Sequence, residues 1–456
     1  MLEGLEVSEI LLSEAKSITG EIRWDSEYYQ KKFLINEVML QKRNSKNLDE
    51  LCNFIKKGIF DLPPSNYIDK GIPLIRTSEI KNPTIDFSTT VYISDDVNQN
   101  NNKTILLPND LVFTKIGAYI GDVALLPNTF SQYNFSQNVA GASIKDKNYS
   151  AFYLAFFLSD IGKNQILRSA MLSGQGKLEL GDIRNYKIPF VSEEFNVQIK
   201  NIFEKREIVV NQSQTLYRKA EELLLETIGL KDFIPSQEKV NVKSFKESFL
   251  ETGRLDAEYY QPKYEEIIKH IETFETERLS KIVSIKKSIE PGSDAYKTEG
   301  IPFIRVSNLS KFGLTDTDIY LDKAKFGNLD LQPKKDTILL SKDGSVGIAY
   351  KVEQDLDIIT SGALLHLTVT NSDFLPDYVT LVLNSEVVKM QAERDAGGSI
   401  IQHWKPSEIE QVIIPKVPMS IQQQISALIQ ESFALRKESE RLLVEAKEMV
   451  EKEVEK

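Results

Sequence analysis

The residue types that most often carry catalysis are sparse in this sequence and do not stand at catalytic spacings. Its three histidines, His270, His366 and His403, lie far apart without a cysteine beside them, so their spacing does not indicate a zinc site. No GxxxxGK[ST] phosphate loop occurs. The stretch DLPPS at 61–65 is similar to the Asp-Pro-Pro-Tyr loop of amino-methyltransferases, but it lacks the aromatic residue that stacks on a base. We therefore predict no catalytic residue, no metal and no cofactor bound to this chain.

Paired carboxylates can act as general acid and base, but here they recur only inside one repeated phrase. Asp25 and Glu27 belong to the phrase RWDSEYYQ, and Asp256 and Glu258 belong to the phrase RLDAEYYQ. We interpret these acids as scaffold, because local hydrogen bonds from them would hold the EYYQ segment against the rest of its domain. The tyrosine pair of each phrase is expected to pack there as well.

The repeated phrase is the first of several that the sequence writes twice in the same order. GIPLIRTSEI and GIPFIRVSNL begin at residues 71 and 300, and FTKIGAYIG and LSKDGSVG begin at residues 113 and 340. DIRNYKIPFV and EIEQVIIPKV begin at residues 182 and 408. The order is kept and the spacing is nearly constant, so the chain is a tandem duplication of about 227 residues.

Each half is expected to fold as an α+β globule followed by a long helix. Strand-like and helical runs are interspersed in 1–192 and 230–418, whereas 193–229 and 419–456 have apolar residues at heptad spacing and no internal proline. The seam positions are Ile202, Val209, Leu216, Leu223, Leu428, Leu435, Leu442 and Met449. Small residues three positions before the seam would let two helices approach closely. We predict an antiparallel coiled coil and a pseudo-twofold chain; the alternative is that each helix packs on its own globule.

Composition and charge set limits on the class of protein. The chain has 456 residues, of which 41% are hydrophobic and 27% charged, as in a soluble protein of several domains. It has no apolar run of about 18 residues, and its acidic start does not resemble a signal peptide. A single cysteine, Cys52, rules out an internal disulfide and fits a reducing compartment. We therefore expect a cytoplasmic protein without a membrane segment.

Taken together, the duplicated order, the GIPxIR strand, the K-x-G turn and the DI…IP exit before each helix resemble the specificity (S) subunit of type I restriction–modification enzymes. The resemblance covers essentially the whole chain. It implies two target-recognition domains, 1–192 and 230–418, separated by the spacer helices 193–229 and 419–456. It also implies a non-catalytic protein that reads a bipartite, asymmetric site in double-stranded DNA. The expected partners are two modification (methyltransferase) subunits that use S-adenosylmethionine, and restriction (ATP-dependent nuclease) subunits that can join them.

Four loops differ between the two halves, as reading two different half-sites requires. They are 129–141 and 172–181 in the first half, and 355–365 and 396–407 in the second. Asn and Gln can pair with adenine, Arg and Lys with guanine or phosphate, and Ser with either. In and around these loops, the predicted DNA contacts of the first half are Lys115, Tyr119, Gln132, Tyr133, Asn134, Gln137, Asn138, Gln175 and Lys177. Those of the second half are Lys342, Ser345, Ser361, Ser399, Gln402 and His403.

Two arginines, Arg76 and Arg305, end the equivalent GIPxIR strands. They can hold DNA phosphates, or they can form ion pairs inside their globules. The net charge of −11 limits how much of the surface can attract DNA, so we expect weak DNA binding by the isolated chain. The charge also fits a competing hypothesis, in which the protein is an acidic DNA mimic or a coiled-coil adaptor that does not touch DNA.

Overall fold

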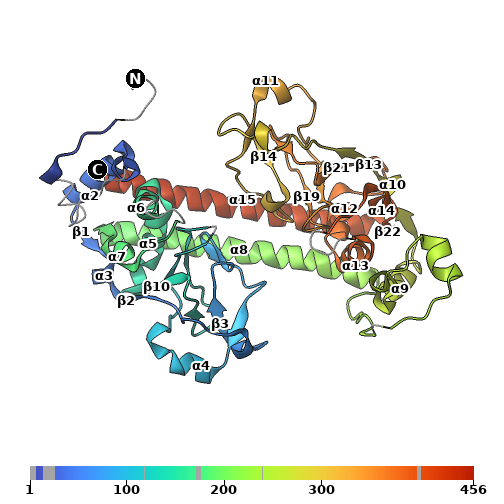
Figure 1. Cartoon of the computed structure of the whole chain (residues 1–456), viewed down its shortest axis with the longest axis horizontal. Helices are drawn as coiled ribbons and strands as arrows, with labels where there is room; N and C mark the ends of the chain where they lie inside the picture. The colour runs from blue at the N-terminus through green and yellow to red at the C-terminus, as the bar shows by residue number, and fades with distance from the viewer. Residues whose placement is uncertain (1–6, 14–25, 118, 171–175, 239, 398–401) are drawn as a thin grey trace. The chain divides into compact units, whose positions relative to one another are not determined.

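The computed structural model describes residues 7–13, 26–117, 119–170, 176–238, 240–397 and 402–456 (Figure 1). The chain forms two compact units. The first unit comprises Met1–Val209 with Lys437–Lys456, and the second comprises Val210–Arg436. Each long helix is divided between the two units, at residues 209/210 and at residues 436/437.

The sheets of the first unit combine strands that are distant in sequence. One sheet has the order β2-β10-β7-β8 and is antiparallel throughout. Another has the order β6-β3-β9, in which β3 and β9 are parallel. The bounds are Cys52–Lys57 (β2), Val139–Ile144 (β10), Leu111–Thr114 (β7), Val123–Leu125 (β8), Val91–Ile93 (β6), Ile72–Ile75 (β3) and Asn134–Phe135 (β9).

The second unit repeats this topology strand for strand. Its sheets have the orders β13-β21-β18-β19 and β17-β14-β20, and β14 and β20 are again the parallel pair. The bounds are Val283–Lys287 (β13), Leu364–Val369 (β21), Ile338–Ser341 (β18), Ala349–Lys351 (β19), Tyr320–Leu321 (β17), Ile301–Ile304 (β14) and Ile359–Thr360 (β20). The duplication and the α+β class predicted from the sequence are confirmed.

The DI…IP phrase forms a short strand that fastens the start of each long helix to its unit. This strand pairs antiparallel with a strand from early in the same unit, β11 with β1 and β22 with β12. The bounds are Lys187–Pro189 (β11), Ser45–Asn47 (β1), Ile413–Pro415 (β22) and Thr276–Arg278 (β12). The long helices begin a few residues later, α8 at Glu193 and α15 at Met419.

The EYYQ phrases form 3-10 helices that pack on a helix of their own unit. The guanidinium of Arg168 in α6 lies 4.0 Å from the centre of the Tyr28 ring, and that of Arg394 in α13 lies 5.2 Å from the centre of the Tyr259 ring. The bounds are Ser26–Tyr29 (η1), Ala257–Tyr260 (η6), Asp160–Ala170 (α6) and Glu386–Asp395 (α13). The phrase therefore serves as scaffold, as predicted, although Asp25 lies outside the described residues.

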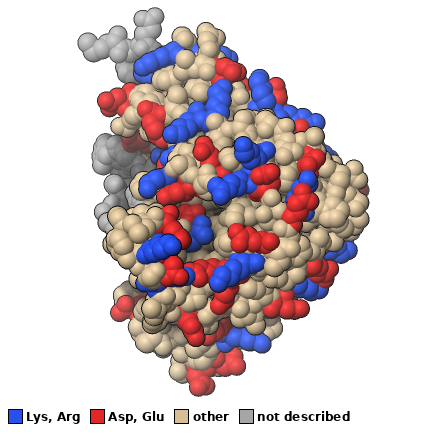
Figure 2. All heavy atoms as spheres, turned by 90° about the vertical axis from the view of Figure 1, so that its right-hand side faces the viewer, with Lys and Arg blue, Asp and Glu red and all other residues tan. Residues whose placement is uncertain are grey.

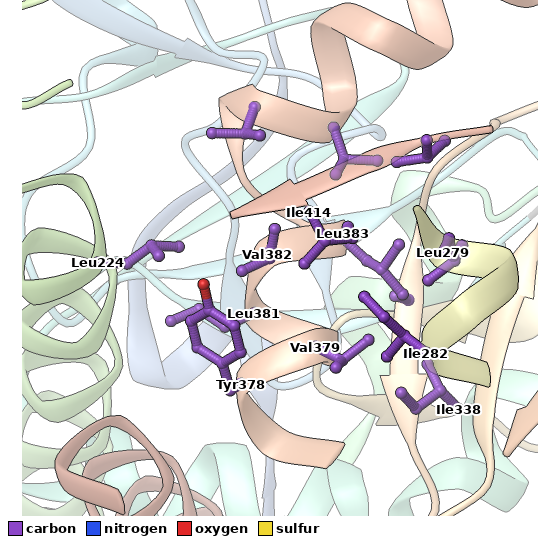
Figure 3. Packing of buried hydrophobic residues seen from close by; sticks show 14 of the residues in the cluster. Leu224, Leu279, Ile282, Ile338, Tyr378, Val379, Leu381, Val382, Leu383 and Ile414 are labelled. Atoms are coloured by element: carbon purple, nitrogen blue, oxygen red, sulfur yellow. The ribbon is translucent and has the colours of Figure 1, made fainter. Parts of the chain in front are cut away.

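The hydrophobic core of each unit lies between a central helix and the larger sheet. In the second unit this helix is α12 (Pro376–Leu383), and its Tyr378, Val379 and Val382 pack with residues such as Ile414 of β22 and Ile338 of β18 (Figure 3). A break separates α12 from α13 at Asn384, whose side-chain amide forms two hydrogen bonds with the backbone of Ala349 in β19. In the first unit α5 (Ser150–Leu158) has the corresponding place.

The two long helices run in opposite directions in each unit. α8 extends over Glu193–Thr227 and α15 over Met419–Glu455, within two residues of the predicted bounds. The first unit combines the start of α8 with the end of α15, and the second combines the end of α8 with the start of α15. Such a combination requires an antiparallel pair. α8 stops before Gly229, whose φ of +65° suits a helix C-terminus, as predicted.

Small residues bring the helices together where the sequence placed them. Ser213 and Ser432 each donate a side-chain hydrogen bond to the other's carbonyl, at 2.9 and 2.8 Å. Ala220, Ser439 and Ala446 are also buried. At Ser213 and Ser432 the two helix backbones are therefore held close together by hydrogen bonds, where other turns of the helices pack larger apolar side chains.

The buried seam is shifted by one residue from part of the predicted one. Val209 and Leu442 are buried as predicted, whereas Ile202, Leu216, Leu223, Leu428, Leu435 and Met449 are only half-buried. Next to Leu216 and Leu223 in α8, the following residues Tyr217 and Leu224 are buried instead. Leu216 with Leu223, and Tyr217 with Leu224, form two adjacent apolar rows along α8, so heptad spacing alone does not show which row is buried. None of the described helices is both long and apolar enough to cross a membrane.

Candidate nucleic-acid interface

Three segments of the first unit meet at one lysine. Lys115 follows β7 and opens the K-x-G turn. Its amide donates to the carbonyl of Asn138 at 2.9 Å, and its carbonyl accepts from the amide of Leu178 at 3.0 Å. The loops 129–141 and 172–181, which the sequence singled out separately, are therefore joined at this turn.

The second unit builds the same junction around Lys342. The amide of Lys342 donates to the carbonyl of Ala363 at 2.9 Å, and its carbonyl accepts from the amide of Trp404 at 2.8 Å. Gly344 has a φ of +75° and donates its amide to the carbonyl of Gln402 at 2.9 Å. The loops 355–365 and 396–407 are thus joined in the way that their counterparts are, by equivalent hydrogen bonds.

The charges around the two central lysines differ. Lys115 is only 6% exposed, and this burial lowers its pKa. The charges of Lys177 and Lys57 lower the pKa further, while the charge of Glu179 raises it. Lys177 is itself paired with Glu179 at 2.7 Å. The first junction therefore holds an excess of positive charge.

In the second junction an aspartate follows the central lysine. Asp343 forms an ion pair with Lys342 and accepts a hydrogen bond from Nδ1 of His403 at 2.9 Å when that nitrogen carries a proton. His403 is otherwise exposed, as are Ser345 and Gln402. This junction presents polar groups whose charges are already balanced.

Several predicted DNA contacts lie at the surface of these junctions. They are Tyr119, Gln137, Asn138, Lys177, Lys342, Ser345, Gln402 and His403, all exposed or half-buried. The ammonium of Lys81 lies 5.5 Å from the centre of the exposed Tyr119 ring. The predicted contacts Gln175 and Ser399 lie outside the described residues. These eight residues give the surface of the junctions its polar side chains.

Three other predicted contacts, Tyr133, Asn134 and Ser361, are buried like Lys115, and the first two hydrogen-bond within their own unit. The Tyr133 hydroxyl donates to the carbonyl of Pro127 at 2.6 Å, and the Asn134 amide donates to Asn98 at 2.9 Å. Both side chains are fully buried, and Ser361 is 5% exposed. Gln132 is half-buried and accepts a hydrogen bond from Asn98. Strand β9 draws residues 134 and 135 into the sheet, so this part of the loop serves folding.

The two strand-ending arginines differ in their surroundings. Arg76 forms a bidentate pair with Glu79, with N–O distances of 2.7 and 3.2 Å, and the Glu79 side chain is fully buried. At the position equivalent to Glu79 the second unit has Asn308, and Arg305 is exposed. Arg76 thus holds its own domain together, whereas the second unit lacks this buried acid.

A pocket of about 320 Å³ lies beside the first junction. Arg76, Ser136, Gln137 and Asn138 are among its lining residues, together with Asp61. Two nearby residues were missed from the sequence, because they lie in framework segments and not in the differing loops. Phe60 is 70% exposed, and the ammonium of Lys57 lies 5.1 Å from the centre of its ring.

In the part of the chain that the structure describes, no three His, Cys, Asp or Glu side chains are grouped as metal ligands. His366 is buried and shares a hydrogen bond of 2.8 Å with Thr360, so it belongs to the core of its sheet. What both junctions offer instead is a polar, partly basic surface made of loops on a shared frame.

Residues 42–218 and 271–442 match the protein family described as "Type I restriction modification DNA specificity domain". Among solved structures, the chain is similar to a type I restriction–modification S subunit from M. genitalium, with 15% identity, a TM-score of 0.41 and coverage of 90% of this chain and 95% of that one. It is also similar to the HsdS subunit from Thermoanaerobacter tengcongensis, with 14% identity, a TM-score of 0.29 and coverage of 90% and 96%. No curated protein matches the chain.

Proposed function

Because the chain belongs to the family of type I restriction–modification DNA specificity domains, we propose that it reads a bipartite, asymmetric DNA site for a modification complex. The observation that carries this proposal is the three-segment junction, which both units build with equivalent hydrogen bonds but different side chains. A shared frame fixes where a reading surface lies, and different loops let the two surfaces prefer different half-sites.

The surfaces suit direct readout of base edges. Gln137, Asn138 and Gln402 carry amides that can pair with adenine, and Lys177 and Lys342 can address guanine or a phosphate. We propose that the paired helices set the distance between half-sites. Helices of 35 and 37 residues are roughly 50 Å long, and half-sites on one side of B-DNA lie about 34–36 Å apart.

The chemistry is assigned to partner subunits. We propose that two methyltransferase subunits dock on this chain and bind S-adenosylmethionine, and that restriction subunits can join the complex. The chain itself has neither a phosphate loop nor a glycine-rich cofactor motif in its sequence. Partners would also add positive charge, which would offset the net charge of −11 during DNA binding.

The net charge of −11 is also compatible with a second function, that of an acidic protein-interaction module that does not bind DNA. A DNA mimic needs acids in a continuous track. The face seen in Figure 2 has basic and acidic side chains intermixed, which does not favour such a track on that face. The family match and the differing polar loops favour the DNA-reading role.

Reconstitution with the methyltransferase subunit of the same system tests the proposal. We expect the purified chain alone to transfer no methyl group, and the complex to methylate adenine in one two-part sequence. The methyltransferase without this chain is the control and should not methylate that sequence. Methylation by the isolated chain, or an unchanged product pattern when the chain is omitted, would contradict the proposal.

A further inference from the structure

Lys115, the central lysine of the first unit, is largely buried, and no anion among the described residues pairs with it. Only 6% of the surface of Lys115 is exposed. Among the described residues, its ammonium has no hydrogen-bond acceptor and no ion-pair partner. Burial disfavours a charge unless an opposite charge compensates it, and burial is the main cause of the lowered pKa of Lys115.

The surroundings of Lys115 add to this excess. Lys177 and Lys57 are the cations that act on it, and Glu179 is the acid that opposes them. Glu179 is already paired with Lys177, while Lys57 lies against the ring of Phe60. Three cations thus face one carboxylate, and that carboxylate is exposed and paired with another lysine.

The second unit shows the same frame with the charge compensated. Lys342 occupies the position of Lys115, and Asp343 occupies that of Ile116. Asp343 pairs with Lys342 and also contacts His403, which replaces Lys177. The second unit keeps a lysine, Lys287, at the position of Lys57, and Glu290 stands where the first unit has Phe60. The two units can therefore be compared directly, because the charge of the central lysine is balanced by Asp343 in the second unit and by no adjacent acid in the first.

We infer that Lys115, with Lys177 and Lys57, forms a phosphate-binding site for the DNA backbone that the second unit lacks. The inference rests on the proposed function, because DNA is the polyanion that reaches this surface. A phosphodiester supplies one negative charge and acceptor oxygens, which are the two things that the Lys115 ammonium lacks. The first unit then grips the backbone electrostatically, and the second depends more on polar contacts.

The salt dependence of DNA binding measures this difference directly. Each neutralised phosphate contributes about −0.9 to the slope of log K against log[salt]. Loss of one contact should therefore weaken binding about eightfold at 0.1 M salt and hardly at all near 1 M salt. A loss of folding or of base contacts would lower affinity without this dependence on salt.

The test uses the full chain assembled with its methyltransferase subunits and a duplex that carries its methylated sequence. Lys115→Gln should reduce the slope by about 0.9, whereas the matched Lys342→Gln should change it much less, because Asp343 already balances that charge. Ile116→Asp keeps Lys115 and imports the acid of the second unit, so it should reduce the slope as Lys115→Gln does. Thermal melting of each complex checks that the variants fold.

Equal slope changes for Lys115→Gln and Lys342→Gln, or an unchanged slope for both Lys115→Gln and Ile116→Asp, would overturn this inference alone. If the wild-type complex does not prefer its methylated sequence over unrelated DNA, the proposed function fails and the inference falls with it. The two failures are therefore separated by the wild-type measurement.

Discussion

The register of the helix pair can be tested by replacing two leucines of α8 with alanine. Leu224 is fully buried in the core of the second unit, whereas Leu216, eight residues earlier in the predicted seam, is half-buried. Truncating a fully buried leucine costs about 2–5 kcal/mol. Truncating a half-buried leucine should cost only about 1 kcal/mol of stability, because that side chain buries less apolar surface in the folded state.

Hydrogen exchange of the α8 amides in 210–227 measures these costs locally. Leu224→Ala should speed the exchange of these amides by roughly thirtyfold to several thousandfold, since about 1.4 kcal/mol corresponds to a factor of ten. Leu216→Ala should speed it by less than about tenfold. The two residues have the same helix propensity, so each controls for the other. An equal or larger effect of Leu216→Ala would show that the assigned seam is wrong.

Three further predictions concern single residues. Burial and the charge of Lys286 lower the pKa of His366 from 6.5 to about 4, so on acidification the unfolded chain binds this proton at a higher pH than the folded chain does. Between pH 7.5 and 5 the unfolding free energy of the wild type, measured by urea titration, should therefore fall by about 2 kcal/mol more than that of His366→Gln. Equal falls would contradict this prediction. Tyr133→Phe should lower stability by about 1 kcal/mol and leave the methylated sequence unchanged, whereas a change of that sequence would return Tyr133 to the interface. Arg76→Met should destabilise the first unit by about 2 kcal/mol, because it leaves the buried carboxylate of Glu79 without its ion-pair partner. Arg305→Met should be nearly neutral when both variants are compared by thermal melting. Equal effects of the two substitutions would refute this explanation.

The sequence predicted the frame better than the details of contact. The repeated phrases indicated the duplicated topology, and the heptads indicated both long helices to within two residues. The heptads indicated only part of the buried seam, because Leu216 and Tyr217 belong to two adjacent apolar rows along α8. The choice between these rows depends on the contact of Ser213 with Ser432, which are 219 residues apart.

The candidate interface shows the same limit. Asn134 and Gln137 look alike in a polar loop, but β9 buries the first by pairing with β3, a strand some 60 residues earlier. The convergence of three segments on Lys115 is likewise set by long-range backbone hydrogen bonds. Lys57 and Phe60 lie in a framework strand and the residues after it, so a search for differing loops did not find them.

The central claim is that the two units read different half-sites independently. Replacing residues 1–192, which end just before α8, with the matching domain of a related protein leaves the second unit's loops 355–365 and 396–407 unchanged. Base contacts contribute roughly 1–3 kcal/mol each and are nearly additive when well separated. Methylome sequencing of cells that carry this chimera and its methyltransferase should show one altered half of the modified sequence, with the other half and the gap preserved. A change in both halves, or in the gap alone, would contradict the account.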